Sequence, residues 1–298
     1  MINCLRVLFF CFFTTWAVAT DHFIFYQQGL YTFCDELKSE MQEKKNLEIE
    51  IRTDEVQRVF EAIQQSTADG IFIKRKLTED EKKSYPDLEE IPIMTDALLF
   101  FVDARLEISN LTKDQIFDCF FKQISWSKVT GKDYPYLKNP LVKPYLNSSG
   151  AGDSQVFLEK MNAIILDESP QRLLIQGQSR DGVLFKQFVD IQNSDKKKIR
   201  YLYQDTGRSI FSNVIGYVSL NPGRVLLEKT SEVSYTLSID GIEASPENIK
   251  KGIYPFAYDC HLVVKKNDKS QKIIEFIELI KTEVFTQFVK NFYYIPKE

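Results

Sequence analysis

A loop of small residues ahead of a predicted helix could bind an anion. The loop consists of Gly150, Ala151 and Gly152, and the helix begins near Asp153 and Ser154. Small residues let the backbone turn sharply, and the first N–H groups of a helix have no partner within it. Those donors and the partial positive charge of a helix start favour a negatively charged ligand. The alternative is a helix start capped from within, because the Asp153 carboxylate can accept the same hydrogen bonds.

Two basic residues, Lys74 and Arg75, could supply further positive charge to such a ligand. They follow the short apolar run from Gly70 to Ile73, which is consistent with a buried strand. The alternative interpretation is a solvated basic patch that continues to Lys76.

The sequence contains no residue pattern that catalysis or metal binding would need. A serine hydrolase of the common type requires a Gly-x-Ser-x-Gly turn, which is absent. The two histidines, His22 and His261, are far apart and have no cysteine or acidic residue at metal-ligand spacing. We therefore expect no enzymatic activity, no cofactor and no metal.

Strands and helices are predicted to alternate along the chain. Short apolar or alternating runs predict strands at His22 to Tyr26, Leu47 to Ile51, Gly70 to Ile73, Ala97 to Val102 and Val214 to Leu220. Apolar residues at helical spacing predict helices at Tyr31 to Met41, Val56 to Ile63, after the Thr112–Gln115 capping box, and as one long helix from Ile273 to Phe288. This alternation predicts an α/β protein with largely parallel sheets.

The first nineteen residues predict a secretory signal peptide. One charge, Arg6, precedes the apolar run Val7 to Phe13, and Ala17-Val18-Ala19 forms a cleavage pattern. An anchor that is not cleaved is the alternative. No later segment approaches the roughly 20 apolar residues that a spanning helix needs. We expect a periplasmic or secreted protein that does not span the membrane once its signal is removed.

The balance of charges limits the possible partners, and the number of cysteines bears on the possible disulfides. The chain has 38 basic and 42 acidic residues, which gives no electrostatic basis for nucleic-acid binding. Cys34, Cys119 and Cys260 would remain after cleavage. An oxidising compartment permits a disulfide, but the odd number leaves its pairing open, and free buried thiols are equally compatible with the sequence.

Several segments along the chain form a recognisable series. They are Leu30 to Leu37, Arg75 with Glu81, Asn110-Leu111-Thr112, Trp126, Gly131-Lys132-Asp133, Ile215-Gly216-Tyr217-Val218 and Tyr254-Pro255-Phe256. In this order they resemble the phosphate-binding, solute-binding proteins of bacterial ABC transporters, a branch of the type 2 periplasmic-binding-protein fold. The block from Asn110 to Asp133 and the Ile-Gly-Tyr-Val strand are the most specific. Together the segments cover most of the chain that follows the predicted signal peptide.

The resemblance implies two α/β lobes with mixed, mostly parallel sheets flanked by helices. Residues 20–102 and 220–298 would form the first lobe, and residues 103–219 the second. A small solute, phosphate or another oxyanion, would bind in the cleft beyond the carboxyl ends of the strands. Hinge closure of the lobes would hold it, and an ABC permease would be the partner.

The resemblance also places the ligand site, but this chain departs from the family pattern there. The site residues would be Gln28, Gly29, Lys74, Arg75, Gly150, Ala151, Gly152, Asp153 and Ser154. The family's Gly-Ser-Ser-Thr loop is Tyr26-Gln27-Gln28-Gly29 here, and its Gly-Ser-Gly-Thr loop is Gly150-Ala151-Gly152-Asp153. Each lost hydroxyl removes a bond to a charged ligand worth roughly 1.5–3 kcal/mol, and the Asp153 carboxylate repels phosphate. The alternative function is therefore an exported interaction or scaffold protein that has lost phosphate binding.

Overall fold

The computed structural model describes residues 22–137, 139–144, 152–169, 172–178, 184–190, 213–220, 234–268 and 270–297. The predicted signal peptide, residues 1–19, and the predicted site residues Gly150 and Ala151 lie outside these ranges. Within them, no helix has both the length and the apolar character needed to cross a bilayer.

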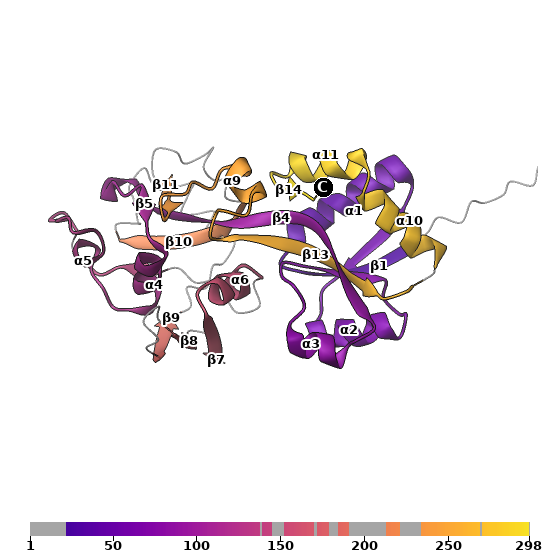
Figure 1. The fold of residues 1–298 in the computed structure, drawn as a ribbon, viewed down its shortest axis with the longest axis horizontal. Helices are drawn as coiled ribbons and strands as arrows, with labels where there is room; N and C mark the ends of the chain where they lie inside the picture. Colours follow the sequence, from indigo (N-terminus) through magenta and orange to yellow (C-terminus); the bar gives the residue numbers. More distant parts are fainter. Residues whose placement is uncertain are drawn as a thin grey trace, which may run out of the picture.

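Three parallel strands form the edge of the sheet in the first lobe. The central strand β1 (His22–Gln28) lies between β2 (Glu48–Arg52) and β3 (Gly70–Ile73). Helices cover both faces of this sheet (Figure 1): α1 (Tyr31–Lys45), α10 (Gln271–Ile280) and α11 (Glu283–Asn291) on one, and α2 (Val56–Gln64) and α3 (Glu79–Ser84) on the other. The apolar sides of α1, α2, α10 and α11 bury the sheet faces, whereas α3 contributes no buried side chain. The buried residues form one large and one smaller hydrophobic cluster.

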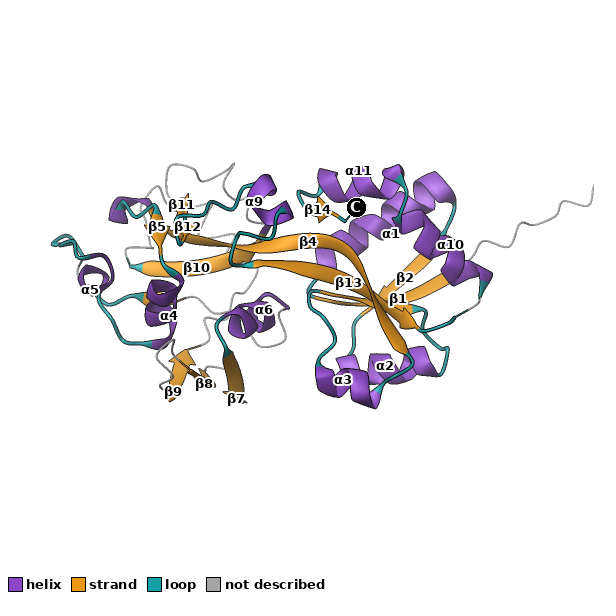
Figure 2. Cartoon of the chain, in the orientation of Figure 1, coloured by secondary structure: helices purple, strands orange, loops and turns teal. Residues whose placement is uncertain are grey.

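Two long antiparallel strands connect the lobes. β4 (Leu88–Asp103) and β13 (Ala257–Lys265) extend between the two lobes as continuous strands, in opposite directions (Figure 2). Strand β13 pairs with β3, so the sheet order is β2-β1-β3-β13-β4-β10-β6. The short strand β14 (Ile295–Pro296) also pairs with β4. One sheet therefore extends through both lobes.

The second lobe surrounds the far end of β4. Strands β10 (Val214–Ser219), β6 (Lys143–Pro144) and β11 (Ser234–Thr236) extend the long sheet there. The short strands β5 (Asn110–Leu111) and β12 (Ser238–Ile239) pair with each other, and β7 (Ala163–Ser169), β8 (Arg172–Gln178) and β9 (Leu184–Asp190) form a third sheet. The helices are η1 (Ala104–Leu106), α4 (Lys113–Phe121), α5 (Trp126–Thr130), α6 (Gly152–Lys160) and α9 (Pro246–Lys250).

Aromatic side chains form the core of the second lobe. The rings of Phe157 on α6 and Tyr217 on β10 stack with centroids 4.6 Å apart, and Phe120 on α4 lies 4.6 Å from Phe157. Trp126 is fully buried and donates from Nε1 to the Asn213 carbonyl at 3.1 Å. The segments of the Asn110 to Asp133 block therefore serve packing, and their place in the fold does not identify a ligand.

The predicted α/β class with two lobes is confirmed, and the Thr112–Gln115 capping box is present. The predicted single C-terminal helix is wrong. Helix α10 ends at Ile280, and Thr282 caps a new helix by accepting from the Phe285 N–H. The apolar stripe continues across this break because α10 and α11 both pack onto the first lobe, so periodicity alone could not reveal it.

Candidate functional site

The loop after β1 touches the start of α6, so two predicted parts of the site meet. Gly29 has a φ of +77°, in the region that favours glycine, and a Cβ there would lie 3.0 Å from the Cα of Gly152. A Cβ on Gly152 would lie 3.2 Å from Cδ of Lys74 and 3.4 Å from the Gln28 carbonyl oxygen. The two lobes therefore touch through their backbones here, beside Lys74.

Lys74 follows β3 in the first lobe and forms an ion pair with the second lobe. Its Nζ lies 2.6 Å from Oδ1 of Asp153 on α6 and 3.6 Å from Oδ2 of Asp96 on β4. The Lys74 side chain is only 4% exposed. Burial opposes its charge, but Asp153 and Asp96 outweigh this and raise the pKa of Lys74 above its ordinary value. We call the contact between Lys74 and Asp153, together with the neighbouring Asp96, the interlobe ion pair. The alternative of a solvated patch is wrong for Lys74.

Asp96 is the member of this group that the sequence analysis missed. Its side chain is fully buried and accepts hydrogen bonds from the Tyr258 hydroxyl at 2.7 Å and from the N–H groups of Ala97 and Leu220 at 2.7 and 2.9 Å. Burial raises the pKa of Asp96, and Lys74 opposes that rise. The available signal was an acidic residue directly before the apolar run from Ala97 to Val102, since an acidic residue in a buried segment needs partners.

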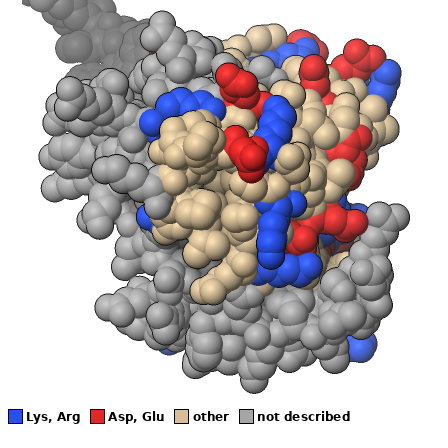
Figure 3. Space-filling view, turned by 90° about the vertical axis from the view of Figure 1, so that its left-hand side faces the viewer, with Lys and Arg blue, Asp and Glu red and all other residues tan. Residues whose placement is uncertain are grey.

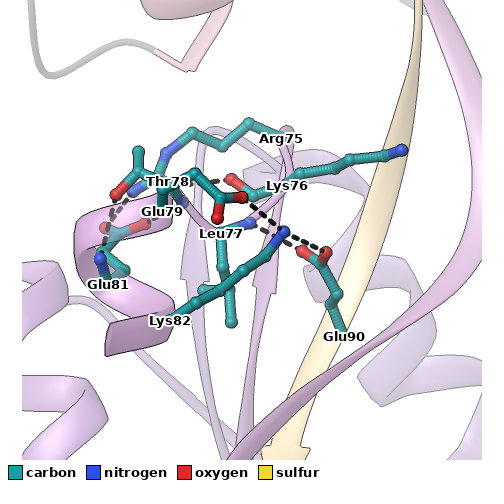
Figure 4. Close-up of polar contacts among 8 residues, drawn as sticks. All are labelled: Arg75, Lys76, Leu77, Thr78, Glu79, Glu81, Lys82 and Glu90. Carbon is teal, nitrogen blue, oxygen red and sulfur yellow. Dashed lines mark hydrogen bonds and ion pairs between the residues drawn. The ribbon is translucent and has the colours of Figure 1, made fainter. Parts of the chain in front are cut away.

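Arg75 is held within its own lobe. Its NH1 and NH2 groups donate to the two carboxylate oxygens of Glu81 on α3, each at 2.6 Å, and NH1 also donates to the Lys76 carbonyl at 2.8 Å (Figure 4). Glu81 in turn accepts from the Thr78 N–H as part of the α3 capping box. Arg75 is 8% exposed, so the alternative of a solvated patch is wrong for it as well. Its guanidinium is directed to α3 and not to Asp153.

Ser154 and Gln27 are also buried, and their side chains form hydrogen bonds within the protein. Ser154 is buried in the second lobe, with its Oγ 3.0 Å from the Tyr217 hydroxyl. Gln27, the neighbour of the predicted residue Gln28, is buried as well: its Oε1 accepts from the Leu30 N–H at 3.0 Å, and its Nε2 donates to the Thr53 hydroxyl at 3.0 Å. The amide of Gln27 thus occupies the start of α1 and joins the loops after β1 and β2.

The interlobe ion pair limits what can bind at this point. It combines one ammonium group with two carboxyl groups, and the start of α6 already carries Asp153 in its first turn. At the start of α6, a negatively charged ligand would compete with Asp153 for Lys74. A carboxylate near a helix start also offsets the partial positive charge there.

Neither thiols nor metal ligands add chemistry to this site. Cys34, Cys119 and Cys260 are buried free thiols, and burial raises the pKa of each. A thiol with a raised pKa is a poor nucleophile at neutral pH. In the parts of the chain that the structure describes, no three His, Cys, Asp or Glu side chains are grouped to hold a metal ion.

We expect His261 to make the fold sensitive to mild acid. His261 is 3% exposed, and its Nδ1 has no hydrogen-bond partner in the described structure. Burial lowers the pKa of His261 below its ordinary value of 6.5, although Glu90 and Asp259 oppose the shift. The unfolded chain therefore binds more protons than the folded chain in this window, and the unfolding free energy should fall as the pH drops from 6.5 through the lowered pKa, by at most about 1.4 kcal/mol per pH unit.

Urea unfolding between pH 7 and pH 5 would measure this slope. His261→Gln should remove it. The control, His22→Gln, changes a side chain that is 46% exposed and should leave it in place. Equal slopes for His261→Gln and the unchanged protein would contradict the assignment.

A known protein family and several solved structures share this architecture. A family model described as the PBP superfamily domain matches residues 30–284. No curated protein sequence matches the chain. Among solved structures, an ABC-type phosphate transport receptor from Vibrio cholerae is similar with a TM-score of 0.66 and 16% identity, covering 92% of this chain and 100% of that one.

Two further solved structures have the same arrangement. A putative phosphate ABC transporter substrate-binding protein with bound phosphate from Clostridium perfringens has a TM-score of 0.64 at 18% identity, over 93% of this chain and 100% of that one. PstS from Borrelia burgdorferi has a TM-score of 0.61 at 15% identity, over 93% of this chain and 99% of that one. At these identities the likeness establishes the fold alone.

Proposed function

This chain belongs to the PBP superfamily, and we propose that it is a solute-binding protein that captures a small solute between its two lobes. Phosphate or another oxyanion is the class of solute that its similarity to phosphate-binding proteins favours. Its role is binding and not catalysis. The alternative of a scaffold that binds no small ligand becomes an outcome of the test below.

One observation carries this proposal: three segments from both lobes converge on a buried cation. Lys74 follows β3, Gly29 follows β1, and the start of α6 faces them from the second lobe. The loops after β1 and β3 leave the carboxyl ends of parallel strands, where ligands of α/β sheets bind. We propose that Gln28, Gly152 and Asp153 also belong to the site, because they adjoin Gly29 and Lys74. Arg75 and Ser154, which bond within their own lobes, would support the site without contacting the solute.

The division into lobes follows the crossing strands β4 and β13. From the sequence, residues 103–219 are predicted to form the second lobe, and residues 20–102 with 220–298 are predicted to form the first. We propose that residues 234–256 belong to the second lobe too, because Ile239 on β12 pairs with Leu111 on β5 and β11 pairs with the far end of β4. The hinge would then lie in the two crossing strands.

Export and transport complete the proposal. A cleavable signal peptide over residues 1–19 would deliver the protein to the periplasm or outside the cell. An ABC permease would receive the captured solute, as the resemblance to transport receptors suggests.

Calorimetric titration of the mature protein with phosphate, sulfate and a panel of metabolites tests this function. We expect one solute to bind with 1:1 stoichiometry and to raise the melting temperature, since a ligand at 100 times its Kd stabilises the native state by about 2.7 kcal/mol. Inorganic phosphate should bind weakly, because it must replace Asp153 at Lys74. If no solute in the panel binds, the capture function is wrong and the scaffold alternative takes its place.

A further inference from the structure

A cavity of about 350 Å³ lies between the lobes, next to the interlobe ion pair. Thr95 and Tyr258 contribute to it from the crossing strands, and Lys74 marks the boundary with the site described above. The first lobe lines it with the loop after β3, and the second lobe with the last turn of α6 and with α9. Its volume is in the range of sites that bind small organic ligands.

The lining of this cavity is strongly basic. Six of its side chains are Lys74, Arg75, Lys76, Lys160, Lys250 and Lys297. Only two are acidic, Glu159 and Asp259. Asp259 is bound to Lys297 at 2.5 Å and also accepts from the Thr95 hydroxyl at 3.0 Å. We call the space the lysine cavity.

Two of the lysines that line the cavity form no ion pair with any residue that the structure describes. Lys74, Arg75 and Lys297 each bind a carboxylate, but over the described ranges no ion pair involves the ammonium group of Lys76 or Lys160. Lys76 comes from the first lobe and Lys160 from the second. An anion that contacts both would therefore link the lobes directly.

The surroundings of Lys160 compensate its positive charge only in part. The residue is half-buried, and burial lowers the pKa of its ammonium group, with Lys113 adding to the effect and Glu159 and Asp259 opposing it. A buried cation is unfavourable unless it is paired. By contrast, on the described part of the far end face of the second lobe, basic and acidic side chains are interspersed (Figure 3).

We propose that the lysine cavity binds a small solute that carries at least two anionic groups and is larger than inorganic phosphate, such as a diphosphate or a di- or tricarboxylate. One anionic group lies toward Lys76 and another toward Lys160, and Asp153 keeps its place at Lys74. This inference rests on the proposed function, because it names the class of solute that the cleft captures. It explains how an interlobe cleft can bind an anion although the start of α6 is already occupied by a carboxylate.

Calorimetry with diphosphate, citrate and inorganic phosphate at constant ionic strength tests the inference on the mature protein. We expect diphosphate or citrate to bind at least tenfold more tightly than inorganic phosphate. The double variant Lys76→Gln with Lys160→Gln should weaken that binding at least tenfold. Neither lysine holds an ion pair in the described structure, so this variant should fold, and its melting temperature would verify that.

A matched control removes two other positive charges. The double variant Lys128→Gln with Lys132→Gln changes exposed lysines in and after α5, at the far end of the second lobe, and should change affinity less than twofold. Equal affinity for inorganic phosphate and the larger anions would overturn the inference, as would unchanged binding in the Lys76 and Lys160 variant. If only an uncharged or cationic solute binds, this inference fails and solute capture stands. If no solute binds, both fail.

Discussion

Replacing Lys74 with methionine should lower the unfolding free energy by about 3–5 kcal/mol, the cost of removing one partner from a buried ion pair. Asp96 is fully buried and Asp153 is 15% exposed, so both carboxyl groups would lose their cation in surroundings that water barely reaches. Methionine retains an unbranched side chain, which limits the cavity that the substitution creates. Urea denaturation at pH 7 would measure the loss as a shift of the midpoint.

Two controls separate this effect from a general response to losing a lysine. Lys76→Met removes an exposed neighbour and should change stability by less than about 0.5 kcal/mol. Adding Asp153→Asn to Lys74→Met should recover part of the loss, since it removes one of the two unpaired charges. If Lys74→Met were as stable as the unchanged protein, the interlobe ion pair would have no role in holding the lobes together.

The pH dependence of the Lys74→Met variant gives a further check. Burial raises the pKa of Asp96 above its ordinary value of 3.8, and without Lys74 the pKa should rise more. The folded variant would then bind more protons than the unfolded chain, so its stability should decrease as the pH rises from 3.8 through the raised pKa. The difference from the unchanged protein should therefore be smaller near pH 5 than at pH 7.

Asp153→Thr should increase the affinity for inorganic phosphate by about 100-fold. The substitution frees Lys74 and the start of α6 and removes a carboxylate from the place where the anion would bind. Each charge-assisted hydrogen bond gained is worth about 1.5–3 kcal/mol. Two such bonds at the lower limit already correspond to about 100-fold. Titration calorimetry of both proteins with phosphate would measure the change.

Asp133→Asn is the matched control for this change. It removes one carboxylate from the second lobe, at an exposed position after α5 that does not line the lysine cavity. Phosphate affinity should change by less than threefold. If Asp153→Thr also left the affinity unchanged, the start of α6 would not be an anion site in this protein, whichever solute the cleft binds.

The two proposed sites make different use of the same cleft. At the start of α6, Asp153 supplies from within the chain the negative charge that Lys74 requires. In the lysine cavity, neither Lys76 nor Lys160 forms an ion pair with a side chain in the described ranges. An external anion is therefore favoured in the cavity and disfavoured at the helix start, unless Asp153 is replaced.

Much of the fold was predictable from the sequence because local patterns encode it. Apolar runs located β1 and β3, the Thr112–Gln115 capping box located the start of α4, and the alternation of elements indicated an α/β protein. Prediction was weaker where local patterns are ambiguous. Strand β4 begins at Leu88, well before the predicted start at Ala97. The sequence did not reveal its first half because polar residues there interrupt the apolar pattern.

The partners of the site residues were decided by the tertiary structure alone. The sequence, through its resemblance to a family, identified Gly29, Lys74 and Asp153 as candidates. It could not show that Lys74 binds Asp153, 79 positions away, or that Arg75 binds Glu81 and leaves the site. Whether a buried charge meets a ligand or another side chain depends on which distant segments the fold brings within about 3 Å. No property of the separate residues contains that information.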